Sequence, residues 1–293
     1  MTAHLRLQSR VFCVLALALV VASMAGVGLA PLHELLAAAV LISLLGMPHG
    51  AFDVVWARKH FGVTGFKAWA LFSLLYVGLA AAVVGVWFLA PTFFLCAFLV
   101  LSALHFGADL EAGVSMIARG LYGGAVIVLP ALSHGPELQR LLGLVAGPAS
   151  AAWVAPALGQ MAAPWLAATV LVCVLQARTS RRAAVELAAL AALAVTAPPL
   201  WAFTAYFCAM HSPRHILRTL ENLPGSAARN ALALALWPTL AVLAVLALLG
   251  GLLRDRPLQE SVMQLVFVGL AALTLPHMVL LERARQVGRA AQR

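Results

Sequence analysis

Residues 206–215 read Tyr-Phe-Cys-Ala-Met-His-Ser-Pro-Arg-His, and this stretch lies inside a strongly apolar segment. His211 and His215 are four residues apart, so a helix places both imidazoles on one face, one turn from each other. An ionisable side chain within a membrane span is costly and marks a functional site by default. Two imidazoles on one face form the start of a metal site. A metal site at this pair requires further ligands from other parts of the chain.

The composition places the chain in a lipid bilayer. Of its 293 residues, 63% are hydrophobic and 10% are charged, and the mean hydropathy is +0.99. Soluble domains carry about 25% charged and about 45–50% apolar residues. The apolar runs are continuous and rich in Ala and Leu, without the alternation that membrane strands need. We therefore predict an all-α, polytopic helical membrane protein, with one integral-membrane domain over residues 1–293.

The basic residues indicate topology and do not indicate a nucleic-acid partner. The net charge is +9, but most of the 19 Lys and Arg residues lie in short links between apolar runs and in the C-terminal tail. This distribution follows the positive-inside rule and predicts that both termini lie in the cytoplasm. The first apolar run is longer than the core of a signal peptide and is expected to remain as a span. The scattered cysteines have no CxxC spacing and fit small core residues.

The apolar runs, cut at charges and at Gly/Pro clusters, predict about 8–10 membrane-spanning helices. The region 136–159, which contains Gly147, Pro148 and Pro156, is expected to be a loop or a re-entrant piece. The candidate spans are 11–30, 35–56, 68–89, 92–110, 114–132, 160–177, 183–199, 201–219, 230–253 and 261–282.

Five of the nine histidines fall within candidate spans: His49, His105, His211, His215 and His277. The predicted topology places all five in the inner half of spans that run in the same direction, so they share one depth. Lys and Arg alone set that topology, which makes the common depth an independent indication of a shared site. The other four histidines lie in termini or links, where a solvated or interfacial role is usual.

Two motifs pair a histidine with a carboxylate one helical turn later, His49 with Asp53 and His105 with Asp109. Each aspartate can accept a hydrogen bond from a ligating imidazole on a neighbouring helix, or act as a direct oxygen ligand. The alternative is that each aspartate simply ends its span at the membrane interface. Tyr206 carries a hydroxyl within a span, and this group needs a partner.

Together these residues form a candidate metal constellation. His49, His105, His211 and His215 offer four nitrogen donors from three helices, and His277 is either a fifth ligand or a nearby hydrogen-bonding group. Imidazole ligation suits iron, copper, zinc or nickel and disfavours magnesium or calcium. The alternative is a set of unrelated core histidines that are satisfied separately.

Four motifs occur in one order along the chain: Pro48-His49-Gly50-Ala51-x-Asp53, His105-Phe106-Gly107-x-Asp109, Tyr206-Phe207-x-x-x-His211-Ser212-x-Arg214-His215 and Pro276-His277-Met278. They resemble the Brp/Blh family, which are bacterial and archaeal integral-membrane β-carotene 15,15′-dioxygenases that supply retinal to rhodopsins. The resemblance implies Fe(2+) bound by His49, His105, His211 and His215. It implies supporting or substrate-channel roles for Asp53, Asp109, Tyr206, Arg214 and His277.

The resemblance also implies a reaction and a location. The expected reaction is cleavage of the central double bond of a lipophilic carotenoid, β-carotene or a relative, by O2 to give retinal. The expected location is the bacterial inner membrane, where such a substrate dissolves. Other functions also fit the histidines: another membrane non-haem iron oxygenase or hydroxylase, a haem-binding cytochrome, or a non-enzymatic carotenoid-binding or transport protein. Two iron ions per chain would indicate a di-iron oxygenase or hydroxylase, and a Soret band in the purified protein would indicate a cytochrome. Bound pigment that survives unchanged in air would indicate a binding or transport protein.

Overall fold

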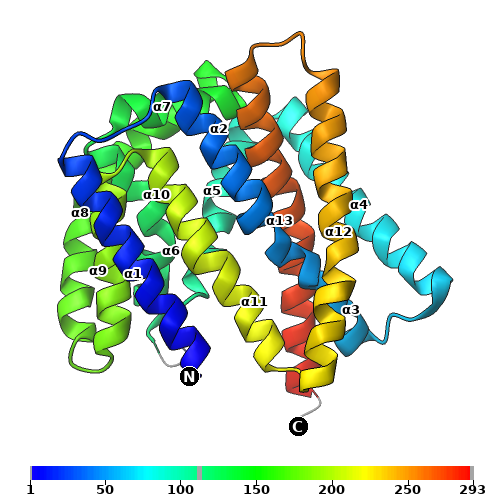
Figure 1. Cartoon of the computed structure of the whole chain (residues 1–293). Helices are drawn as coiled ribbons and strands as arrows, with labels where there is room; N and C mark the ends of the chain where they lie inside the picture. Colours follow the sequence, from blue (N-terminus) through cyan, green and yellow to red (C-terminus); the bar gives the residue numbers. More distant parts are fainter. Residues whose placement is uncertain (1, 111–113, 291–293) are drawn as a thin grey trace.

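The structure is a computed structural model that describes residues 2–110 and 114–290, with side chains described as far as residue 287 (Figure 1). Within these residues the chain forms helices and no strand, which confirms the predicted all-α membrane fold. The elements are α1 (Ala3–Met24), α2 (Pro31–Leu41), η1 (Ile42–Gly46), η2 (Met47–Phe52), α3 (Asp53–Phe61), α4 (Gly65–Leu89), α5 (Pro91–Gly107), α6 (Met116–Val128), η3 (Leu129–Leu132), α7 (Gly135–Ala146), α8 (Pro148–Gln176), α9 (Arg181–Thr196), α10 (Pro199–Tyr206), η4 (Phe207–His211), α11 (Ser212–Glu221), α12 (Gly225–Leu252) and α13 (Leu258–Ala290).

Fewer helices have the length and hydropathy of a membrane span than the sequence predicted. Six helical stretches in the described part of the chain are long and apolar enough to cross a membrane, or seven if the bent pair α6–α7 forms one span. The predicted number of 8–10 is larger because some apolar runs form helices that are short or broken. The 17 residues of α5, for example, give a length of about 26 Å, against a hydrocarbon core of about 30 Å.

Residues 136–159 are helical, and the expected loop is absent from this described region. α7 ends at Ala146, and α8 begins at Pro148. Gly147 makes the break with a φ of +85°, which glycine adopts without a Cβ penalty. Pro148 stands in the first turn of α8, where a missing N–H costs nothing, and Pro156 is accommodated inside the helix. The feature closest to the expected re-entrant piece is a bend of 115° between α6–η3 and α7.

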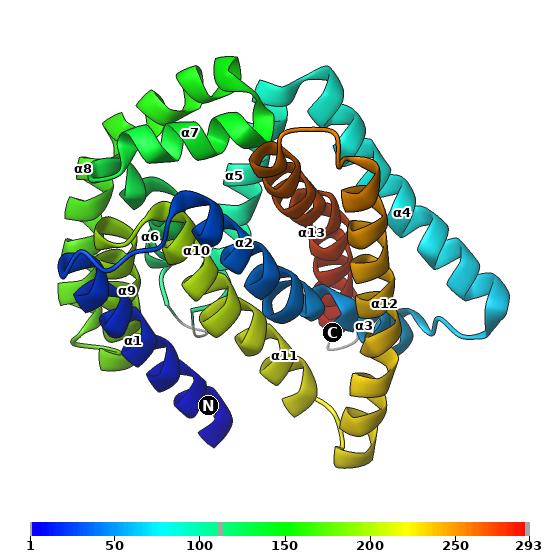
Figure 2. The ribbon, with the colours of Figure 1, turned by 45° about the horizontal axis from the view of Figure 1, so that its top comes forward.

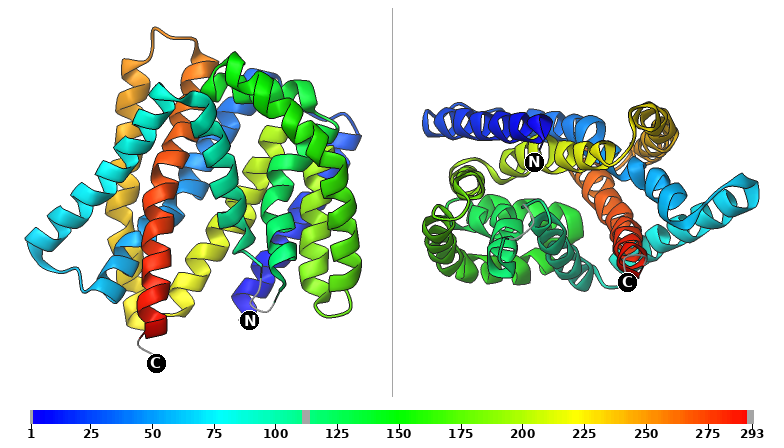
Figure 3. Two further views of the ribbon diagram at one scale, coloured as in Figure 1. Left: turned by 180° about the vertical axis from the view of Figure 1, so that it is seen from behind. Right: turned by 90° about the horizontal axis from the view of Figure 1, so that it is seen from below.

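The helices form a bundle in which both described ends of the chain lie at the same end (Figures 1 and 3). α4 leans away from the other helices at its N-terminal end, which Figure 2 shows from another angle. No residue of α4 is buried, although its sequence is strongly apolar. α4 therefore presents its surface to lipid, as expected of a membrane helix at the periphery of a bundle.

Two of the helices are interrupted by π-helical turns. η1 follows α2, and η4 follows α10; such turns occur frequently at functional sites. Pro213 has no N–H to donate to the carbonyl of Ala209, and Gln8 Nε2 donates to that carbonyl instead at 2.7 Å. Ser212 Oγ similarly donates to the carbonyl of Leu45 at 2.6 Å. Neighbouring side chains thus satisfy backbone groups that the irregular turns leave available.

Gly46, the last residue of η1, allows the two π-helical turns to pack together. A Cβ at this position would lie 2.4 Å from Phe207 Cε1. We expect Gly46→Ala to lower the free energy of unfolding by about 1–3 kcal/mol, because overpacking forces neighbouring groups to move. Thermal unfolding in detergent measures this change. Gly50→Ala is the matched control, since no described atom outside the glycine's own neighbourhood lies within 4 Å of its Cβ position. Equal stability of the two variants would contradict the packing argument.

Candidate metal centre

The fold brings together the five histidines that the sequence analysis places at one depth. They come from five elements, His49 from η2, His105 from α5, His211 from η4, His215 from α11 and His277 from α13. Ring centroids are 4.6 Å apart for His105 and His211, 4.9 Å for His49 and His211, and 5.0 Å for His215 and His277. The donor atoms of His49, His105 and His277 all lie within 4.8 Å of one another. These three side chains form a compact group, and His211 and His215 lie directly beside it.

Three of the rings are oriented by hydrogen bonds from their Nδ1 atoms. His49 Nδ1 lies 2.6 Å from the carbonyl oxygen of Gly46. His211 Nδ1 lies 3.0 Å from Asp109 Oδ2, and His277 Nδ1 lies 2.7 Å from Asp53 Oδ1. A carbonyl or a carboxylate can only accept, so Nδ1 carries the proton in each case. In the neutral imidazole, Nε2 then keeps its lone pair for a ligand.

Four histidine Nε2 atoms lack a hydrogen-bond partner. Among the described residues, Nε2 of His105, His211, His215 and His277 is buried and has no hydrogen-bond partner. Buried polar side-chain atoms are nearly always paired, so four such atoms in one cluster require an explanation. A metal ion that accepts imidazole nitrogen is a partner of the right chemistry. The residues therefore fit a metal centre.

The two aspartates each support a histidine of another helix. Asp53 follows His49 by one turn but accepts the hydrogen bond of His277, and Asp109 follows His105 but accepts that of His211. A tyrosine also donates to each carboxylate. Tyr76 donates to Asp53 Oδ2 at 2.9 Å, and Tyr206 donates at 2.6 Å to Asp109 Oδ2, the oxygen that also accepts from His211. The same Tyr–Asp–His arrangement thus occurs twice. It is the arrangement of outer partners that fixes the tautomer and orientation of ligating histidines.

Arg214 lies behind this centre. It is buried and binds both carboxylate oxygens of Glu186, with N–O distances of 2.8 and 2.9 Å. Its Nη1 also donates to the backbone carbonyl of Asp109 at 3.0 Å, and Arg218 donates to the same carbonyl at 2.7 Å. Arg214 therefore connects α9 to the segment that carries Asp109. Arg214 thus holds the segment of Asp109 in place from behind, and it does not line the cavities beside the histidines.

Two residues of this site, Glu186 and Tyr76, were not predicted from the sequence. Glu186 is the one acidic residue in the apolar run 183–199, a position that is costly unless the carboxylate is paired. Tyr76 carries a hydroxyl inside the run 68–89, which is the argument that selected Tyr206. Both could have been found by the rules applied to the histidines and to Tyr206.

An apolar cavity reaches the histidine cluster from the lipid side. It has a volume of about 460 Å³, is lined by parts of η1–α3, α4, α12 and α13, and includes His49 and His277 in its wall. Its lining also includes Val77 and Trp237, whose side chains are largely exposed on the outer surface. A second apolar cavity of about 260 Å³ between α4, α5 and α13 shares Thr274 with it. An apolar compartment thus extends along α13 past the cluster.

The other side of the cluster is polar. A cavity of about 210 Å³ is lined by His105, His211 and His215, together with charged and amide side chains that include Arg218 and Asn222. The histidines therefore separate an apolar compartment from a polar one.

The fold and the site define a multi-pass membrane protein with a buried, histidine-rich candidate metal centre beside an apolar cavity. Sequence comparison agrees with this class and gives the family. A sequence model described as β-carotene 15,15′-dioxygenase matches residues 40–283. The chain belongs to the β-carotene 15,15′-dioxygenase family, as the four sequence motifs indicated.

Two related sequences illustrate the relationship. The chain is 31% identical over 262 residues to the β-carotene 15,15′-dioxygenase of uncultured marine bacterium 66A03, covering 84% of this chain and 92% of the relative. It is 29% identical over an alignment of 300 residues to the probable β-carotene 15,15′-dioxygenase Blh of Halobacterium salinarum, covering 86% and 84%. No solved structure gives a significant match.

Proposed function

We propose that this protein cleaves the central 15,15′ double bond of β-carotene with O2 and releases two molecules of retinal. Both oxygen atoms of O2 enter the products, one in each aldehyde, so the reaction needs no further reductant. The observation that carries the proposal is the convergence of five histidines, four of them with a buried and unpaired Nε2 atom, in a member of this family. Family membership supports the reaction, and the donor set supports a metal-dependent mechanism.

His49, His105, His211 and His215 would hold Fe(2+), and the position of His277 beside His49 and His105 makes it a candidate fifth donor. Ferrous iron held by neutral imidazoles, with a position left open, supplies the activation of O2. Asp53 and Asp109 hold the Nδ1 protons of His277 and His211, which keeps their Nε2 atoms available.

The chain's other contribution is to place the substrate. β-Carotene is a hydrocarbon and is recognised through burial of apolar surface, which the cavity lined by α4, α12 and α13 provides. His49 and His277 stand in the wall of this cavity, so a polyene within it passes beside the donor atoms. Exclusion of water from this compartment protects reactive intermediates from hydrolysis. We further propose that the protein lies in the bacterial inner membrane with both termini in the cytoplasm.

Expression in a bacterium that accumulates β-carotene tests the function. We expect loss of orange colour and appearance of retinal with the wild-type protein. His211→Ala should retain the pigment and lose most of its bound iron, because it removes one donor and leaves Asp109 without its imidazole partner. His134→Ala is the control, since this histidine lies on an exposed turn with Ser133. Persistence of β-carotene with the wild-type protein, or full activity and iron content in His211→Ala, would overturn the proposal.

A further inference from the structure

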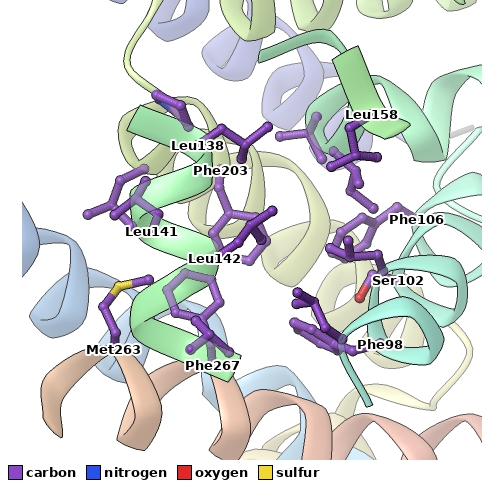
Figure 4. Close-up of a pocket in the computed structure, with 17 residues that line it drawn as sticks. Phe98, Ser102, Phe106, Leu138, Leu141, Leu142, Leu158, Phe203, Met263 and Phe267 are labelled. Carbon is purple, nitrogen blue, oxygen red and sulfur yellow. The ribbon is translucent and has the colours of Figure 1, made fainter. Parts of the chain in front are cut away.

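A fourth cavity lies inside the bundle between α5, α6, α7, α8, α10 and α13 (Figure 4). Its volume is about 90 Å³, and it shares no lining residue with the 460 Å³ cavity. Most of its lining side chains are buried. Ser102 is the one polar side chain among the described residues that line it. Figure 4 shows Leu142 and Phe267 facing Phe106 and Ser102 across the space.

Aromatic residues in the cavity wall connect it to the histidine cluster. Phe106 lines it and follows His105 in the chain, and its ring lies 4.9 Å from that of His211. Phe203 also lines it and stacks at 5.3 Å on Phe207, which stacks at 5.5 Å on His211. Aromatic side chains therefore stand between the cavity and the donor atoms. Movement of one such ring would connect the cavity to the imidazole nitrogens.

The size and chemistry of the cavity select a small apolar occupant. A buried water needs about two to four polar partners, whereas apolar cavities stay dry and bind small apolar molecules. One hydroxyl does not meet the requirement of a water. The volume is also below the range of about 300–1,000 Å³ that is typical of pockets for larger organic ligands. Half of a carotenoid therefore does not fit without rearrangement, whereas a diatomic gas does.

We propose that this cavity binds dioxygen and holds it beside the histidine cluster. The proposal rests on the proposed function, in which O2 is a substrate. It assigns the two substrates to separate compartments, with the carotenoid on the α4–α12 side and O2 between α5 and α7. O2 would then approach the centre without passing the space that the polyene fills.

Xenon tests the cavity independently of catalysis. Met263 lines it, so [13C-methyl]methionine labelling of the metal-free protein in detergent gives a direct probe. We expect xenon to shift the Met263 resonance in the wild-type protein, and Leu142→Phe to abolish the shift by filling the space. Met161, which is exposed on α8, gives the reference signal for non-specific effects. A Met263 signal that does not respond to xenon in the wild-type protein would overturn the proposal.

Kinetics test the assignment to O2. We expect Leu142→Phe and Leu158→Phe, which fill the cavity from α7 and α8, each to raise the KM for O2 by about tenfold with little change in the KM for β-carotene, because they remove a site for a small apolar molecule. Two filling variants guard against misfolding of either one. We expect Val242→Phe, in the wall of the 460 Å³ cavity, to raise the KM for β-carotene with little change in the KM for O2.

The outcomes separate this proposal from the proposed function. An unchanged KM for O2 in both filled variants would overturn the dioxygen assignment alone. A parallel rise in the KM for β-carotene would also overturn it and would assign the cavity to the second half of the polyene. A wild-type protein that binds xenon but consumes no O2 with any carotenoid would overturn the proposed function, and the dioxygen assignment with it.

Discussion

Glu186→Leu is expected to lower the free energy of unfolding by about 3–5 kcal/mol, because it leaves a buried guanidinium without its counter-charge. Arg214 is 1% exposed and has both carboxylate oxygens of Glu186 as partners. The carboxylate also accepts a hydrogen bond from Ser9 and lies 3.1 Å from Arg182 Nε, so its loss disturbs the contact between α1 and α9. Denaturant unfolding in detergent measures the effect.

The double variant Glu186→Leu/Arg214→Met is the matched control. Replacing both members of a buried ion pair by apolar residues of similar size is often nearly neutral, whereas removal of one member is strongly destabilising. We therefore expect the double variant to recover most of the lost stability. A double variant as unstable as Glu186→Leu would show that the carboxylate acts through Ser9 and Arg182 instead. Wild-type stability of Glu186→Leu would contradict the argument altogether.

The placement of the histidines could be predicted from the sequence because each position within a membrane span has a defined depth in the bilayer. Lys and Arg fix which way a span runs, and the position of His49 or His277 within its span then fixes its height in the bilayer. Depth can be assigned without knowing which helices are neighbours. The five histidines could therefore be grouped from the sequence, although fewer helices than predicted have the length and hydropathy of a span.

The sequence did not predict which residue of a neighbouring helix each side chain contacts. The spacing of His105 and Asp109 puts both on one helical face, but the hydrogen bond of Asp109 goes to His211, because η4 brings that ring close to the end of α5. The π-helical turns that set this geometry have no periodicity that a sequence pattern displays. The different surroundings of α4, which has no buried residue, and of α9, half of whose residues are buried, could not be predicted either, since hydropathy does not distinguish a protein-facing helix from a lipid-facing one.

Asp53→Asn is expected to weaken iron binding by about 10–100-fold, because the carboxylate that orients a ligating histidine sets both its tautomer and its basicity. Asp53 accepts from His277 at 2.7 Å and from Tyr76 at 2.9 Å. An amide can present either its oxygen or its NH2 group to His277, and in the second case the Nδ1 proton moves to Nε2 and removes the lone pair. Competition of the purified protein against a chelator of known iron affinity measures the change.

Two variants isolate the role of the carboxylate. Tyr76→Phe removes the hydroxyl donor and leaves the Asp53–His277 contact, so we expect a smaller loss of affinity than in Asp53→Asn. Glu282→Gln removes an exposed carboxylate on α13, the helix of His277, and should leave iron binding unchanged. If Asp53→Asn binds iron as tightly as the wild-type protein, His277 is not a ligand, and the metal is held by His49, His105, His211 and His215 alone. If affinity falls as expected and His277→Ala produces an equal or larger fall, His277 acts as a fifth donor, and the two Tyr–Asp–His groups have the same task at one centre.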